Sequence, residues 1–168
     1  MSKDDQLKEI IFSVARLEEH KDNHKIIVAL ISLDADPNPI AHALQPDSDE
    51  IVDTFLDEFE SSANRSEMVA ILEAMMTQPE FAPSFFRIKT WDQLSALISM
   101  NDFSISSEAL HLFTQVVDHE YPAMREAKYE FTQNEAEEVV RLFNCMFHQD
   151  SYLTTTFALI TMRKLLDT

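Results

Sequence analysis

The chain contains no glycine among its 168 residues. Average usage is about 7%, so roughly twelve glycines would be expected. Glycine is the usual residue for positive φ in β-hairpins, for phosphate-binding loops and for the turns of Rossmann folds. Its absence argues against β-rich folds, excludes Gly-based nucleotide motifs and favours helices joined by short turns.

Basic residues are also few. The chain has 13 Lys and Arg against 30 Asp and Glu, which gives a net charge of −17. Phosphate binding needs clustered Lys and Arg, so nucleic acid and anionic membranes are not expected as partners. A basic protein partner is compatible with this surface, although an acidic surface also serves solubility.

Cysteine occurs once, which excludes an internal disulfide and any Cys-pair metal site. Cys145 falls within an apolar stripe, and we expect a buried thiol there. The N-terminal MSKDDQLKE is polar and has no apolar signal core. The longest aliphatic run, IIVALI (26–31), is too short to span a bilayer. These features predict a soluble, cytoplasmic protein.

Helical periodicity is what the chain has in abundance. Apolar residues recur at steps of three and four, and Pro, Asp, Asn and Ser clusters interrupt them. SEMVAILEAMM (66–76) aligns without gaps with SEALHLFTQVV (107–117), and a further shift aligns the latter with the last helix. Each copy follows another amphipathic helix, and short Pro-containing segments follow the first three pairs.

Two long helices and a short one, at this period, are typical of armadillo/HEAT repeats. We therefore predict an all-α, armadillo/HEAT-like helical-repeat solenoid that forms a single domain over 1–168. Neighbouring repeats would stack into one continuous core. The sequence divides into about four repeats, at about 4–45, 48–88, 90–130 and 131–168.

The stretch MNDFSISSEALHLF (100–113) resembles the signature of the calcium-binding protein 39 family, the Mo-twenty-five kinase scaffolds, with its Phe-x-Ile-x-Ser-acid-Ala-x-x-x-Phe pattern. QDSYLTTTFALITMRKLLD (149–167) resembles the following family helix. The likeness covers roughly 25–168 and is strongest over 70–168. It implies a non-catalytic rod whose concave surface clamps a sterile-twenty-type kinase or pseudokinase in its active conformation.

On that resemblance, Phe103 and Tyr152 match two aromatic positions of the family's binding surface. Thr156 stands where the family has a basic residue shortly after the second aromatic. Family members also carry a more C-terminal pocket for a Trp-Glu-Phe tail motif, which the 168 residues do not include. The family name implies no calcium site here, because an EF-hand loop with its required glycine is missing.

The residues themselves leave two explanations open for Phe103. If Ser104 is the N-cap, a hydrophobic staple would pair Phe103 with Glu108, whose charge rules the staple out. Core packing between repeats and contact with a partner both remain. Phe103 and Tyr152 occupy equivalent repeat positions at the starts of adjacent parallel helices, so we expect their rings along one edge, where aromatic anchors are common in interfaces.

Further candidates lie on the same two helices. His111, Gln115 and Thr156 are expected to line the concave, partner-binding side, with a solvated polar face as the alternative. Leu153, Phe157 and Ile160 extend the apolar surface of the last helix around its other side. Such a helix either packs against a partner or a second copy of the chain, or is simply central in the fold.

Catalytic and metal-binding patterns are weak. His20 and His24 are one turn apart, but the HExxH arrangement and a third ligand are missing. Acidic residues at helix starts complement the helix dipole. We expect no enzyme, no metal and no cofactor. The predicted function is a scaffold that binds a kinase or pseudokinase; the alternative is an adaptor or homo-oligomer unrelated to kinases, with the C-terminal helix as its interface.

Overall fold

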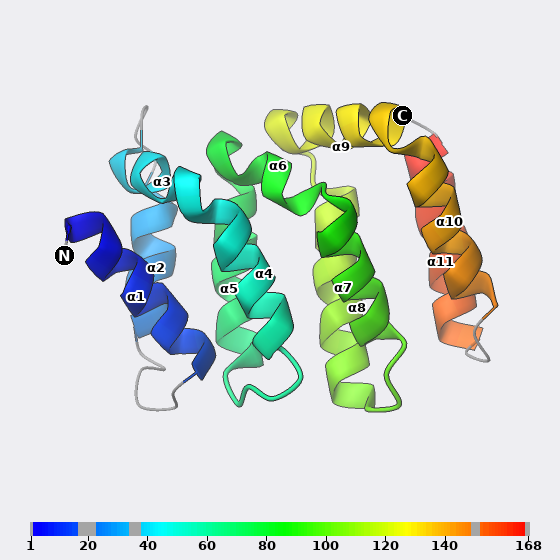
Figure 1. Ribbon diagram of the computed structural model, residues 1–168, viewed down its shortest axis with the longest axis horizontal. Helices are drawn as coiled ribbons and strands as arrows, with labels where there is room; N and C mark the ends of the chain where they lie inside the picture. The colour runs from blue at the N-terminus through cyan, green and yellow to red at the C-terminus, as the bar shows by residue number, and fades with distance from the viewer. Residues whose placement is uncertain (1, 17–22, 34–37, 149–151, 167–168) are drawn as a thin grey trace. The chain divides into compact units, whose positions relative to one another are not determined.

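The structure, a computed structural model, describes residues 2–16, 23–33, 38–148 and 152–166 (Figure 1). The chain divides into two compact units, unit 1 (Met1–Phe85) and unit 2 (Phe86–Thr168). The described residues form helices and turns without a β-strand, which confirms the all-α prediction for them. None of their helices is both long enough and apolar enough to traverse a bilayer.

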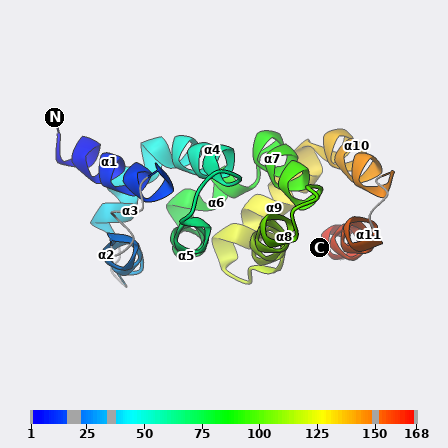
Figure 2. The ribbon, with the colours of Figure 1, turned by 90° about the horizontal axis from the view of Figure 1, so that it is seen from below.

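Unit 1 is built from helix pairs followed by shorter helical segments. Its described elements are α1 (Lys3–Arg16), α2 (Asn23–Ile31), α3 (Pro39–Leu44), η2 (Gln45–Asp47), α4 (Ser48–Glu58), α5 (Arg65–Met76), η3 (Pro79–Phe81) and α6 (Ala82–Phe85). The strongest packing is α2 on α5 and α1 on α4, and α1 also contacts α2. The long helices therefore form two layers (Figure 2). Phe55, Phe59 and Phe81 are completely buried in this core.

Unit 2 repeats the arrangement of long helices. Its described elements are α7 (Ile88–Ile98), α8 (Phe103–Asp118), α9 (Pro122–Asn134), α10 (Ala136–Phe147) and α11 (Tyr152–Leu166). α7 packs on α8 and α10, and α11 packs on α8 and α10. These contacts place α7 and α10 in one layer and α8 and α11 in the other (Figure 2).

Trp91 forms the centre of the unit 2 core. Its side chain is fully buried, and its ring centroid lies 4.8 Å from that of Phe113 in an edge-to-face arrangement and 4.9 Å from that of Phe131. Phe143 also meets it edge to face at 6.4 Å. Aromatic pairs in such geometry stabilise a core beyond the area they bury. The cluster joins side chains from α7, α8, α9 and α10.

The helix C-caps defined among the described residues all have negative φ, which suits a chain without glycine. In the described part of the chain, φ at the helix C-caps runs from −53° at Ala82 to −118° at Glu135. Several helices end in a tighter 3₁₀-type turn, with a hydrogen bond from one residue to the carbonyl three residues earlier. At the end of α5, for example, the Thr77 N–H donates to the Ala74 carbonyl (3.1 Å). Proline begins α3 and α9, where its missing N–H costs no helix bond.

Asn38 connects the end of α2 to the start of α3. Its side chain is buried; Nδ2 donates to the carbonyls of Ile31 (2.8 Å) and Leu33 (3.1 Å). Its Oδ1 accepts from the backbone N–H groups of Ile40 (3.0 Å) and Ala41 (3.2 Å). One amide thus satisfies orphan carbonyls of one helix and orphan N–H groups of the next.

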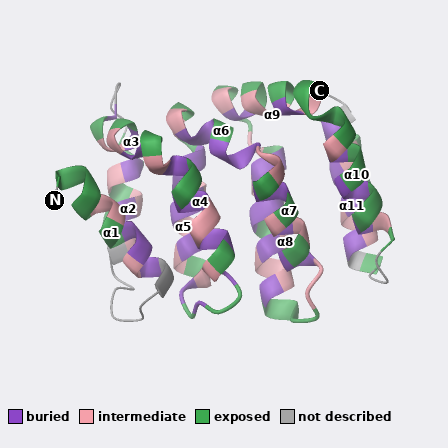
Figure 3. Cartoon of the chain, in the orientation of Figure 1, coloured by how far each residue is buried: buried purple, intermediate pink, exposed green. Residues whose placement is uncertain are grey.

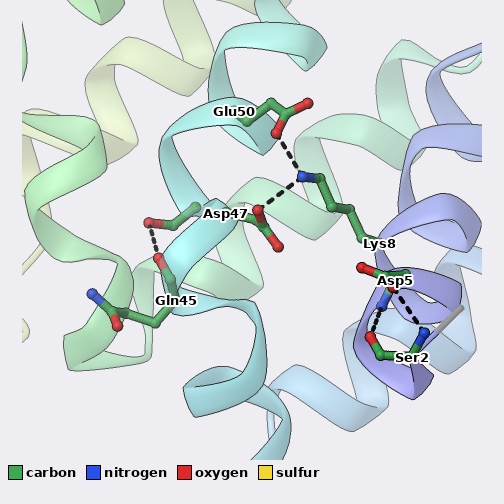
Figure 4. A network of polar contacts seen from close by, with 7 residues as sticks. Ser2, Asp5, Lys8, Gln45, Asp47 and Glu50 are labelled. Carbon is green, nitrogen blue, oxygen red and sulfur yellow. Dashed lines mark hydrogen bonds and ion pairs between the residues drawn. The ribbon is translucent and has the colours of Figure 1, made fainter.

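A polar network joins α1 to the start of α4 (Figure 4). Lys8 Nζ lies 2.8 Å from Asp47 Oδ1 and 2.6 Å from Glu50 Oε2. The hydrogen bonds to Asp47 and then Glu50 raise the pKa of Lys8 above its usual value. The folded state therefore binds the Lys8 proton more tightly than the unfolded state does. The network's contribution to stability is fully present below the pKa of Lys8 in the unfolded chain, and it is lost as the pH rises through the higher pKa of the folded state.

Candidate functional site

Phe103 is the first residue of α8, and its side chain is 77% exposed. The N-cap is Asp102, whose Oδ1 accepts from the Ile105 N–H (3.1 Å). The assignment of Ser104 as N-cap was therefore wrong. Asp102, two residues earlier, caps the helix, so Phe103 belongs to the first turn of α8. With that exposure, core packing no longer explains Phe103.

Tyr152 is the first residue of α11 and is 83% exposed. α8 and α11 contact each other, and in Figure 1 both helices begin at the lower edge of unit 2 and run upward. In Figure 3 the ribbon at both helix starts carries the colour of exposed residues. The two aromatic residues thus occupy corresponding positions on neighbouring parallel helices, as their repeat positions predict.

The polar candidates lie farther along the same helices. His111 is exposed on α8, and Gln115 is half-buried one turn later. Thr156 on α11 is half-buried. The buried face of α8 consists of Ile105, Ala109, Leu112, Phe113, Val116 and Val117. None of the three polar residues belongs to a buried face, so their side chains remain accessible on the two helices that Phe103 and Tyr152 begin.

The apolar candidates on α11 separate into different environments. Phe157 is half-buried, and its ring centroid lies 5.2 Å from that of Phe113 on α8, so it takes part in packing within unit 2. Ile160 is 51% exposed. The side chain of Leu153 lies outside the described residues. Leu159, the residue before Ile160 in the sequence, is 58% exposed.

The buried face of α11 contains two threonines. Thr154, Ala158, Thr161 and Leu165 point into unit 2, where the two threonines are each 2% exposed. Because the helix is apolar on several sides, its periodicity alone does not single out the face that packs. Packing against α8 and α10 selects the smaller side chains and leaves Leu159 and Ile160 on the surface.

Cys145 corrects another expectation, because its thiol is exposed. α10 buries Val139, Leu142, Phe143 and Met146. These residues follow a spacing of three, one and three, which turns Cys145 away from the packed side. Val140 also falls outside this spacing and is 48% exposed.

The side chains at the five partner-binding candidate positions are two aromatic rings, an imidazole, an amide and a hydroxyl. Among the described residues, no three or more His, Cys, Asp or Glu side chains are grouped to hold a metal ion. His24 of the predicted His20–His24 pair is half-buried on α2, and His20 lies outside the described residues. Comparisons of the chain with protein-family models, with curated proteins and with solved structures found no match.

Proposed function

We propose that this chain is a non-catalytic scaffold, an armadillo/HEAT-like helical-repeat protein that binds a protein partner along α8 and α11. The observation that carries the proposal is the exposure of Phe103 (77%) and Tyr152 (83%) at the starts of two helices in contact. Large rings exposed to this extent contribute little to folding. Aromatic side chains are enriched among the residues that dominate binding energy in interfaces.

The repeat architecture is supported by the order of the elements. A pair of long helices followed by shorter helical segments occurs as α1–α3, as α4–α6 and as α7–α9. The fourth pair, α10 and α11, packs on α7 and α8 as the repeat predicts. Repeats stacked in this way present parallel helices side by side, which makes a long surface for a partner.

The proposed partner is a sterile-twenty-type kinase or pseudokinase in the cytoplasm. This choice rests on the resemblance of 100–113 and 149–167 to the kinase-scaffold family. Binding would shift the partner toward its active conformation, which requires a higher affinity for that conformation than for the inactive one. His111, Gln115 and Thr156 would supply the polar contacts around the two anchors.

The test is a double substitution, Phe103→Ala with Tyr152→Ala. We expect the thermal melt followed by circular dichroism to stay nearly unchanged, because both rings are exposed. Loss of two interface anchors should weaken binding of the captured kinase by at least about a hundredfold. The measurement is affinity capture from the native cell, scored for kinases, followed by titration of the captured kinase with each purified variant.

The control is Tyr129→Ala, which removes an exposed aromatic ring (55%) from α9 of the same unit. It should bind as the unsubstituted chain does. Unchanged kinase binding by the double variant would reject the assignment of the anchors. A collapse of its thermal melt would show that the rings support the fold and would reject it as well.

A second candidate function is homodimerisation through α11, independent of kinases. It is favoured by the adjacent exposed side chains of Leu159 (58%) and Ile160 (51%). Light scattering at high concentration should then report a dimer, and Leu159→Glu should return it to a monomer. Ile26→Glu, at a residue 62% exposed on α2, is the control and should leave the dimer intact. A monomer at every concentration would reject this candidate.

A further inference from the structure

An open hollow of about 670 Å³ lies in unit 2 at the end of α8. Val117 and Asp118 line it from α8, His119 and Glu120 from the connection to α9, Arg125 and Lys128 from α9, and Lys164 from α11. We name these seven residues the basic hollow. In Figure 1 the end of α8, the helix α9 and the end of α11 all lie at the upper edge of unit 2, opposite the edge where Phe103 and Tyr152 begin their helices.

The basic hollow has a positive net charge, whereas the chain as a whole is strongly negative. Three of the 13 Lys and Arg residues meet here, and the lining contains two carboxylates, Asp118 and Glu120. The lining therefore carries one net positive charge at neutral pH, in a chain whose net charge is −17. A local excess of cations in an acidic protein attracts anions at short range even where the overall field repels them.

Two of the three cations already have partners in the fold. Lys164 Nζ forms an ion pair with Asp118. Lys128 Nζ donates to the Val117 carbonyl (3.3 Å) at the end of α8. Arg125 differs: its guanidinium has no hydrogen bond or ion pair with the described residues, although its backbone N–H bonds to the Tyr121 carbonyl. The planar guanidinium therefore keeps its five donors for a ligand.

The pKa of Lys128 responds first to burial and then to its charged neighbours. Burial lowers the pKa of this half-buried ammonium, and nearby Arg125 and Lys164 lower it further, against an opposing effect of Asp118. An anion placed between these side chains would relieve the repulsion among the cations.

His119 adds a neutral polar group to the lining. Burial lowers its pKa, so the imidazole is uncharged at neutral pH. Its Nδ1 accepts from the Tyr121 N–H (3.3 Å), which assigns the ring proton to Nε2. The hollow consequently combines three cations with a hydrogen-bond donor.

We propose that the basic hollow is a binding site for an oxyanion, the carboxylate of an acidic side chain or the phosphate of a phosphorylated group, with Arg125 as its main ligand. Guanidinium groups bind both anions through paired N–H···O bonds. The half-buried Lys128 contributes a second positive charge. Lys164, which is paired with Asp118, contributes a third.

The experiment titrates the ¹⁵N-labelled chain with sodium propionate in one arm and inorganic phosphate in the other, at ionic strength held constant with sodium chloride. Saturable shifts are expected at the backbone amides of 117–120 and at the Arg125 side chain. Saturation by propionate assigns the site to carboxylates and saturation by phosphate to phosphorylated groups. Shifts no larger than those caused by chloride in both arms would overturn the proposal.

Arg125→Gln is the decisive variant, because its exposed guanidinium has no partner in the described fold and the substitution should leave folding intact. Loss of charge-assisted hydrogen bonds should lower the affinity for the anion that saturates the site about tenfold. Arg163→Gln on α11 is the matched control, with the same change in charge outside the lining. Retained affinity in Arg125→Gln, or equal loss in both variants, would overturn the proposal.

Discussion

Phe113→Ala is expected to lower the free energy of unfolding of unit 2 by about 3–5 kcal/mol, the usual cost of deleting a buried phenyl ring. Phe113 is completely buried and touches two aromatic neighbours, Trp91 at 4.8 Å and Phe157 at 5.2 Å. Its removal leaves a cavity beside three packed helices, which do not collapse freely into the space. An effect of this size amounts to a large part of the stability of an ordinary domain.

The single tryptophan makes the measurement specific for unit 2. Trp91 is the chain's only tryptophan and is fully buried beside Phe113. Urea unfolding followed by its emission should show a midpoint lowered by about 2 M, given the slope usual for small domains. Phe103→Ala is the matched control, because it deletes the same ring from the same helix at an exposed position, and should stay within about 0.5 kcal/mol. Equal effects of the two variants would contradict the assignment of core and surface on α8.

Asn38→Asp is expected to destabilise unit 1 by about 3 kcal/mol or more, although it changes a single atom. The introduced carboxylate could still accept from the Ile40 and Ala41 N–H groups. Its second oxygen, however, would replace the Nδ2 that donates to the carbonyls of Ile31 and Leu33. The carbonyls that accept from this Nδ2, that of Leu30 (3.4 Å) included, would lose their donor and face a buried negative charge.

Urea unfolding followed by circular dichroism measures this cost, with Asn38→Ala as the intermediate case at about 1–3 kcal/mol. Asn101→Asp is the control, since it introduces the same charge at an exposed residue before the start of α8. An acid near a helix start is neutral or slightly favourable. If Asn38→Asp proved as stable as Asn101→Asp, the amide of Asn38 would not join α2 to α3 in the manner described.

The sequence predicted those features of the fold that depend on residues close together in the chain, such as the helices and the turns between them. Periodic apolar residues followed by proline predicted the helices and their breaks, and α3 and α9 both begin at a proline. The sequence also placed Phe103 and Tyr152 at corresponding helix starts. The exposure of those two rings needed the structure, because an aromatic residue at a repeat position is equally compatible with a core.

Other features depend on contacts between distant segments. Both Asp102 and Ser104 are good N-cap residues, so local preference does not choose between them. α11 is apolar on several sides, and packing against α8 and α10 decides that Ala158 is buried and Leu159 exposed. The basic hollow combines residues of α8, α9 and α11. Arg125 and Lys128 are one turn apart in the sequence, but Lys164 joins them only through tertiary structure.

The negative φ of the described helix C-caps has a consequence for the unfolded chain. Where native φ is negative, replacing glycine by alanine stabilises a protein by about 0.4–1 kcal/mol, because the unfolded backbone has fewer conformations to lose. The described helix C-caps all have negative φ, between −53° at Ala82 and −118° at Glu135. A Cβ atom at every position of the chain therefore lowers the entropy that folding must overcome, and part of the stability of these helices originates in the denatured state.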